Sequence, residues 1–188
     1  MTPIIESIHA EYLRYKALAD AALAQLTDTE LVTPGLGGGN SIATICWHVS
    51  GNLRSRFTDF LGSDGEKPWR TREEEFLPRA VSRDELVAKW DQGWHVLLAT
   101  LAELTDEQLP VTVTIRKQPL RVHEALLRSL AHVSYHVGQI VYAAKALRGP
   151  DWTYLSIPPG QTDAYNRAPK SERPADHQAA IAARVAKP

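Results

Sequence analysis

The chain has 188 residues, a formal net charge of −1, 44% hydrophobic residues and 23% charged residues. This is the balance of an ordinary globular protein, long enough to bury a core without a disulfide or a metal to hold it together. Because there is no large basic excess, the composition argues against nucleic acid or an anionic membrane as a partner.

The N-terminus and the cysteine content bear on the compartment. Cys46 is the only cysteine, which excludes an intrachain disulfide and fits a reducing compartment. The opening segment, MTPIIESIHAEYLRYK, lacks the apolar run and cleavage site of a signal peptide. No apolar run is long enough to cross a bilayer. We therefore expect a soluble, cytoplasmic protein.

Two amphipathic helices are predicted in the first third of the chain. Apolar residues recur at spacings of three and four from Pro3 to Leu26, and again from a cap at Asn40 or Ser41 to Gly62. The segment between them, TDTELVTPGLGGGN, is expected to be a flexible connector. Its glycines do not make a phosphate-binding loop, because the full spacing and the Lys-Ser/Thr ending are missing.

Two further helices are predicted in the second half. Ser82 and Glu85 form a capping box for a third helix, which ends near Thr105. The alternating segment VTVTI then predicts a short strand or hairpin arm. A fourth helix is expected from about Arg121 to Leu147, closed by Gly149-Pro150.

Four long helices without a credible sheet predict an all-α protein, with a four-helix bundle over residues 1–149. The pattern changes after Pro150, where DWTYLSIPPGQTDAYN is mostly non-helical and carries several aromatic residues. We expect residues 150–188 to form a mostly irregular extension that packs on the bundle. A short helix fits within HQAAIAARVA, and the end of the chain is expected to be flexible.

Histidines on two of these helices form a candidate metal site. His132 and His136, in SLAHVSYHVGQI, lie four residues apart and therefore on one helix face. Imidazole is a good ligand for zinc and related ions, but a catalytic site usually has three protein ligands and one open position. His48 is a third interior histidine, on the second helix. Burial favours the neutral imidazole that binds metal, although the same residues could instead be hydrogen-bonded packing residues.

Other reactive side chains carry weaker signals. Each of the remaining histidines is a poor candidate: His9 lies towards the edge of the first helix's apolar stripe, His95 adjoins Trp94, His123 is more than two turns from His132, and His177 is in the tail. Cys46 falls on the apolar stripe of the second helix, on a different side from His48. We interpret it as a buried structural cysteine rather than a nucleophile.

Four polar residues near the histidines are candidates for positioning a ligand or a substrate. Asn52 follows His48 by one helical turn, and Gln139 follows His136 by three residues, so either could orient a ligand or a bound water. Each could equally be a polar residue that satisfies the bundle interior. Arg54 and Arg56 could bind a substrate carboxylate, but they lie two residues apart, so at least one is expected to face solvent.

Three segments, in this order, resemble the DinB-like (YfiT-like) metalloenzyme superfamily, and more narrowly its DUF1572 branch. They are ICWHVSGNLRSRFTDFLGSDGEKPWRTREEEF, LAHVSYHVGQIVYAAKALRG and WTYLSIPPGQTDAYN. The resemblance extends from Ile4 to Asn166. It implies an up-down-down-up bundle, usually a homodimer, and a divalent metal held by three histidines that correspond to His48, His132 and His136. Zinc or nickel is the metal most favoured, with iron or manganese as alternatives.

The resemblance leaves the reaction open. Characterised relatives are thiol-dependent transferases and isomerases that use small thiols, or metal-binding domains of sulfoxide-forming enzymes; the DUF1572 branch has no settled reaction. We therefore expect a metal-dependent enzyme acting on small molecules, of the thiol-dependent transferase or hydrolase type, with its catalytic residues unassigned. The alternatives are a stress-related bundle that binds metal or a ligand without turnover, and a helical interaction module whose histidines only pack.

Overall fold

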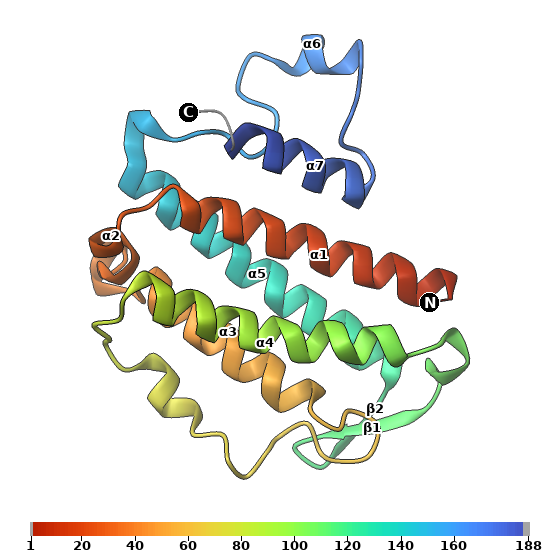
Figure 1. The fold of residues 1–188 in the computed structure, drawn as a ribbon. Coiled ribbons are helices and arrows are strands. Elements are labelled where there is room, and N and C mark those ends of the chain that lie inside the picture. The colour runs from red at the N-terminus through yellow and green to blue at the C-terminus, as the bar shows by residue number, and fades with distance from the viewer. Residues whose placement is uncertain (1, 186–188) are drawn as a thin grey trace.

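The computed structural model describes residues 2–185, and most of them are helical, as the sequence predicts (Figure 1). The long helices are α1 (Pro3–Ala24), α3 (Ile42–Phe57), α4 (Arg83–Glu103) and α5 (Val122–Arg148). The shorter ones are α2 (Asp28–Val32), α6 (Thr162–Asn166) and α7 (Pro174–Val185). Short 3-10 turns cover Leu36–Gly38, Arg72–Phe76, Asp106–Gln108 and Gly149–Asp151. None of the helices in the described part of the chain is long and apolar enough to span a membrane.

Contacts between the long helices fix their relative directions. The N-terminus of α1 meets the end of α4, where the Ile5 amide donates to Asp106 at 3.0 Å. The start of α4 meets the end of α1, where Arg83 donates to the Leu23 carbonyl at 3.1 Å. Helices α1 and α4 are therefore antiparallel. The Tyr12 hydroxyl donates to the carbonyl of Leu126, in the first half of α5, at 3.0 Å.

Helix α3 runs alongside α4 and also packs against α5. Ser50 donates to the Lys89 carbonyl, and further along both helices Thr100 donates to the Phe57 carbonyl at 3.0 Å, so α3 and α4 are parallel. The two approach closely at Gly93, where a Cβ atom would lie 2.5 Å from the Ser50 Cα. Figure 1 shows α5 running in the opposite direction to both helices.

The predicted apolar faces form one core. Its largest fully buried side chains come from all four long helices and from α2, and they include Tyr12, Leu31, Leu53, Phe57, Trp90, Trp94 and Leu126. Cys46 is fully buried in this core, and burial raises the pKa of its thiol well above the usual range. A neutral, inaccessible thiol is a packing group, which is the role that the sequence indicates.

Helix α3 ends at Phe57, five residues before the Gly62 end that the sequence predicts. Thr58 is extended, and Asp59 takes a left-handed conformation with φ 47°. The amides of Gly62 and Ser63 then donate to the Asp59 carbonyl. This tight turn keeps Phe60 in the core, 7% exposed, so the apolar pattern continues although the helix does not.

The predicted strand forms a hairpin, with β1 (Thr112–Ile115) antiparallel to β2 (Gln118–Arg121). Its two turn residues, Arg116 and Lys117, have φ values of 54° and 61°, a turn geometry that glycine or asparagine usually supplies. Asp64 accepts hydrogen bonds from both amides, at 2.8 and 2.7 Å. Hydrogen bonds from the Glu66, Lys117 and Arg116 amides lower the pKa of Asp64 to about 2, so a charged carboxylate holds the turn.

The segment after α5 lies against the first helix. Trp152 and Leu155 are buried, and α7 runs along α1 with its Ile181 side chain 2% exposed (Figure 1). Helix α7 includes most of the short helix expected in HQAAIAARVA. The flexible end predicted for the chain falls on residues 186–188, which lie outside the described part.

Candidate metal centre

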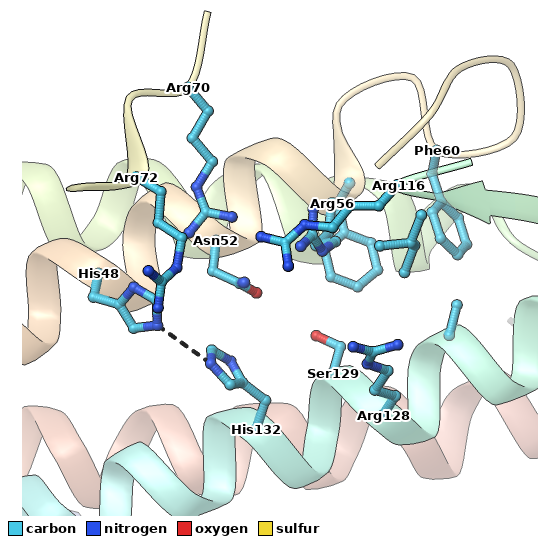
Figure 2. A pocket seen from close by; sticks show the side chains of 13 residues that line it. His48, Asn52, Arg56, Phe60, Arg70, Arg72, Arg116, Arg128, Ser129 and His132 are labelled. Carbon is cyan, nitrogen blue, oxygen red and sulfur yellow. Dashed lines mark hydrogen bonds between the residues drawn. The ribbon is translucent and has the colours of Figure 1, made fainter. Parts of the chain in front are cut away.

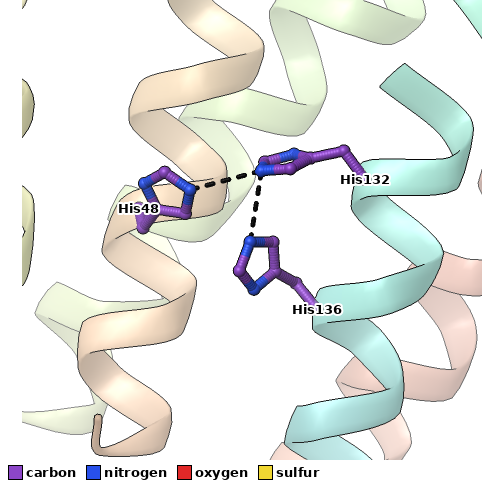
Figure 3. Close-up of side chains that lie close together, drawn as sticks. All are labelled: His48, His132 and His136. Atoms are coloured by element: carbon purple, nitrogen blue, oxygen red, sulfur yellow. Dashed lines mark hydrogen bonds between the residues drawn. The ribbon is translucent and has the colours of Figure 1, made fainter. Parts of the chain in front are cut away.

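Three histidine side chains from two helices converge on one point between α3 and α5 (Figure 3). His48 projects from α3, and His132 and His136 project from successive turns of α5. The Nε2 atom of His132 lies 3.3 Å from Nε2 of His48 and 3.2 Å from Nε2 of His136. One ligand nitrogen from each residue lies within 4.8 Å of the other two.

This spacing fits a metal ion. Two nitrogens that bind one ion at about 2.0–2.1 Å with tetrahedral angles lie roughly 3.3 Å apart. Both short Nε2–Nε2 distances, 3.3 and 3.2 Å, match this separation. His48 is 5% exposed and the other two are half-buried, so the three rings have few alternative partners.

Hydrogen bonds on the far side of two rings fix their tautomers. Nδ1 of His48 lies 2.9 Å from Glu75 Oε2, and Nδ1 of His136 lies 2.8 Å from Gln139 Oε1. Because both partner atoms are acceptors, each Nδ1 carries the proton and each Nε2 presents a lone pair. Two lone pairs therefore point at the third histidine. Its Nε2 carries at most one proton, which cannot satisfy both fully, whereas a cation accepts both lone pairs.

Burial favours the neutral form of both histidines on α5. The pKa of His132 is lowered to about 3, chiefly by burial and then by the positive charge that His136 and His48 would carry. Burial also lowers the pKa of His136, although the hydrogen bond to Gln139 partly offsets this. His132 Nδ1 is buried without a hydrogen-bond partner among the described residues. His132 is therefore neutral over the physiological pH range, with one unprotonated ring nitrogen that can bind a metal.

Glu75, in the 3-10 turn Arg72–Phe76, is a functional candidate that the sequence did not reveal. It is 6% exposed and receives two hydrogen bonds of 2.8 Å from Arg70 in addition to its contact with His48. Burial alone would raise the pKa of Glu75, but hydrogen bonds from Arg70 and His48 outweigh burial and lower it. The result is an ionised, buried carboxylate that orients one metal ligand, an arrangement common around metal-binding histidines.

A glycine on α3 makes room for this carboxylate. A Cβ atom on Gly51 would lie 2.0 Å from Glu75 Oε1 and 2.7 Å from its Cδ. Gly51 is one helical turn from His48 and costs helix stability in the middle of α3. The signal that could have led to Glu75 was therefore a mid-helix glycine near a histidine, but it does not say which of the residues in REEEF approaches it.

A cavity of about 210 Å³ opens beside the histidines (Figure 2). His48 and His132 line one end of it. The walls come from α3, the 58–72 segment, the hairpin and α5, and their residues include Asn52, Arg56, Phe57, Phe60, Arg70, Ile115, Arg116, Arg128 and Ser129. The candidate metal position is therefore next to a space that a small molecule can enter.

The structure separates the four polar candidates. Gln139 contacts His136 directly, and Asn52 lines the cavity between the histidines and Arg56 (Figure 2). Arg56 also lines this cavity, whereas Arg54 lies over the Trp69 ring, 5.2 Å from its centroid, in a second pocket. The two arginines therefore face different pockets, and both are half-buried, although we expected at least one to face solvent.

The other histidines take no part in the cluster, which is the one group of three potential metal ligands found in residues 2–185. His123 and His177 contact backbone carbonyls, those of Leu109 and Leu155. Sequence reasoning gave all four of these residues a weak signal, and the structure brings none of them to the site.

Comparisons with known proteins identify a family but no characterised relative. A family model described as "Protein of unknown function (DUF1572)" matches residues 1–161. No curated protein and no solved structure matches the chain.

Proposed function

The chain belongs to the DUF1572 family, and we propose that it is a metal-dependent enzyme that holds one divalent transition metal ion through His48, His132 and His136. The observation that carries this proposal is the convergence of three histidines, with Nε2 of His132 at 3.3 and 3.2 Å from Nε2 of His48 and His136. Imidazole ligands suit zinc and nickel, which we propose as the native metals, and iron fits the same donors.

The proposal includes the fold that the resemblance implies. In it, α1, α3, α4 and α5 form an up-down-down-up bundle of the DinB-like type over residues 1–149, with residues 150–188 packed on it. Support comes from the antiparallel contact of α1 with α4 and the parallel contact of α3 with α4. A metal site between two facing helices is a common feature of such bundles.

The cavity beside the histidines favours catalysis over storage of an ion. A bound divalent ion supplies Lewis-acid chemistry there, stabilising a thiolate or making water acidic enough to attack at neutral pH. The chain contributes the rest: Glu75 and Gln139 hold two ligand rings in the correct tautomer, and Asn52 offers an amide to a molecule in the cavity. We propose a thiol-dependent transferase or a hydrolase acting on small molecules.

Metal content tests the proposal directly. Untagged protein purified without chelator is analysed for transition metals, and the same measurement is repeated after incubation with zinc, nickel, manganese and ferrous salts. We expect about one ion per chain, in keeping with a single three-histidine site. Little or no metal under all these conditions would make the histidines packing residues. One tightly bound ion without any turnover in thiol-transfer and hydrolysis screens would favour the non-catalytic alternative.

A further inference from the structure

The cavity next to the histidines is lined by several positively charged side chains. Five arginines reach it from four parts of the chain: Arg56 from α3, Arg70 and Arg72 from the segment before α4, Arg116 from the hairpin turn and Arg128 from α5. Among the described residues that line the cavity, none is acidic. The space beside the proposed metal is therefore strongly electropositive.

Nearby carboxylates neutralise only part of this charge. Glu75 takes both hydrogen bonds of Arg70, so that arginine is committed to the support of His48. Glu66 is shared between Arg56, at 3.2 Å, and Arg116, at 2.8 Å.

Because they share one carboxylate, Arg56 and Arg116 keep one positive charge between them, and two further arginines have no buried acidic partner. Arg72 pairs with Glu73, whose side chain is 89% exposed, so water screens this pair. Arg128, an exposed residue of α5, takes part in none of the ion pairs among the described residues. The cavity thus keeps net positive charge after all these contacts are counted.

The guanidinium groups face one another across the cavity. Figure 2 shows Arg56 and Arg116 on one wall and Arg128 on the opposite wall, with Asn52 between them and the histidines. Like charges held around a small space are unfavourable unless an anion lies between them. Arginine is the side chain best suited to bind the two oxygens of a carboxylate or phosphate at once.

The turn that carries Arg116 has an energetically unfavourable backbone conformation. Arg116 and Lys117 both hold left-handed backbone conformations, which are unfavourable for residues with a Cβ atom. Asp64 binds both amides, and a Cβ atom on the neighbouring Gly65 would be in tight contact with Arg56 Cδ at 3.2 Å. Strained backbone of this kind is retained where it positions a functional group.

From this arrangement we infer that the substrate carries a compact oxyanion, which Arg56, Arg116 and Arg128 bind while its reacting part lies beside the three histidines. This inference rests on the proposed function, because it takes the histidines as the reacting end. The cavity of about 210 Å³ is smaller than the ~300–1,000 Å³ of pockets for drug-sized ligands, so the molecule is small. Carboxylate, sulfonate and phosphate groups share the recognised chemistry.

Calorimetric titration of the full chain, metal-free and zinc-loaded, tests the inference with three probes: malonate, ethanesulfonate and inorganic phosphate. We expect saturable binding of at least one probe to both forms of the protein. Arg128→Gln should weaken this binding about tenfold or more, because it removes a charge-assisted hydrogen bond. The probe that binds most tightly identifies the oxyanion.

The hairpin turn offers a matched pair of variants. Arg116→Asn removes the guanidinium and puts a residue that tolerates the left-handed conformation in its place, so binding should weaken about tenfold while the fold is kept. Lys117→Gly relaxes the same turn but leaves Arg116 in place, so binding should be unchanged. Arg167→Gln, which alters an exposed arginine of the extension, controls for net charge.

The outcomes distinguish this inference from the proposed function. Absence of saturable binding by the wild-type protein, or equal binding by wild type, Arg116→Asn and Arg128→Gln, would overturn the anion site even if one metal ion binds. Weakened binding in Lys89→Gln, in the neighbouring pocket, with normal binding in Arg128→Gln would place the anion elsewhere and overturn it too. Arginine-dependent binding by a protein that takes up no metal when it is incubated with zinc, nickel, manganese or ferrous salts would support the anion site and contradict the metal proposal.

Discussion

His48 and the pair on α5 present nitrogens to the same point but are supported in different ways. His132 and His136 lie one turn apart on a single helix, and the partner of His136 is the neutral amide of Gln139, three residues on. His48 is held by Glu75, which lies 27 residues away and is itself held by Arg70. One half of the site is thus set by helix geometry, and the other by an irregular segment between α3 and α4.

The difference matters because the two supports have different surroundings. Glu75 and Arg70 are almost completely buried, with side chains 8% and 2% exposed, so neither can exchange its partner for water. Gln139 is half-buried, and water can replace it as an acceptor for His136. We therefore expect the α3 half of the site to be the more sensitive to substitution, and the variants below test this from the largest effect to the smallest.

Removal of a metal-binding histidine from either helix should have the largest effect on metal content. His132→Ala is the cleanest case, because Nδ1 of His132 has no hydrogen-bond partner among the described residues and little else is disturbed. We expect metal content to fall from about one ion per chain to near zero, because two ligands seldom suffice. Elemental analysis measures this, with circular dichroism as the control for helix content. Full metal content in the variant would contradict the ligand set.

Gly51→Ala should break the support of His48 by steric conflict. The added Cβ would overlap Glu75, and displacing this carboxylate leaves Arg70 buried without its partner. Losing a buried pair costs about 3–5 kcal/mol, and the gain in helix propensity returns only about 1 kcal/mol. Denaturant unfolding should show a net loss of about 2 kcal/mol or more. Zinc affinity should fall as well.

Gly138→Ala is the matched control on α5. Nothing lies within 4 Å of the Cβ that it would add, although Gly138 is only two residues from His136. This variant should be more stable than wild type by about 0.5–1 kcal/mol and should keep its zinc affinity. Similar behaviour of the two alanine variants would contradict the proposed asymmetry.

Glu75→Gln should weaken metal binding without a steric change. The amide keeps an acceptor for His48 but loses the charge that makes this ring a stronger ligand, and partners of this kind are typically worth 10- to 100-fold in affinity. Competition with a chromophoric chelator measures the change in zinc affinity. An unchanged affinity would mean that Glu75 serves only to neutralise Arg70.

Gln139→Leu should have the smallest effect. Nδ1 of His136 loses its acceptor at 2.8 Å, but the half-buried position of Gln139 allows a water molecule to accept this hydrogen bond instead. We expect zinc affinity to fall by less than about tenfold, the lower end of such effects. A larger loss here than in Glu75→Gln would reverse the comparison and make α5 the critical half.

The sequence predicted most of what depends on local periodicity. Helical spacing and capping residues gave the long helices, and the capping box at Ser82 is present as expected. The predicted end of α3 lies beyond the observed one, because Phe60 continues the apolar pattern after the helix has ended at Phe57. An apolar pattern indicates which side chains are buried, but a tight turn can bury a side chain as well as a helix can.

The candidate site shows the same limit. Spacing alone indicated His132 and His136, and burial together with family resemblance added His48. Neither signal pointed to Glu75 or Arg116, which come from separate segments and meet the histidines only in the folded chain. Arg128 lies one helical turn before His132 on α5, but that spacing did not show that a cavity lies beside it. Glu75 and Arg116 also have charged neighbours in sequence, so composition did not distinguish them from solvated surface.

The sequence by itself determined the helices, their apolar faces and the pair of histidines, because each depends on interactions between residues a few positions apart. The tertiary structure decided which carboxylate supports His48, which of Arg54 and Arg56 faces the cavity, and how many arginines surround it. These depend on where the 58–72 segment and the hairpin turn lie against α3 and α5. That placement is fixed by long-range contacts such as the hydrogen bonds of Asp64 to the turn amides, which no local pattern encodes.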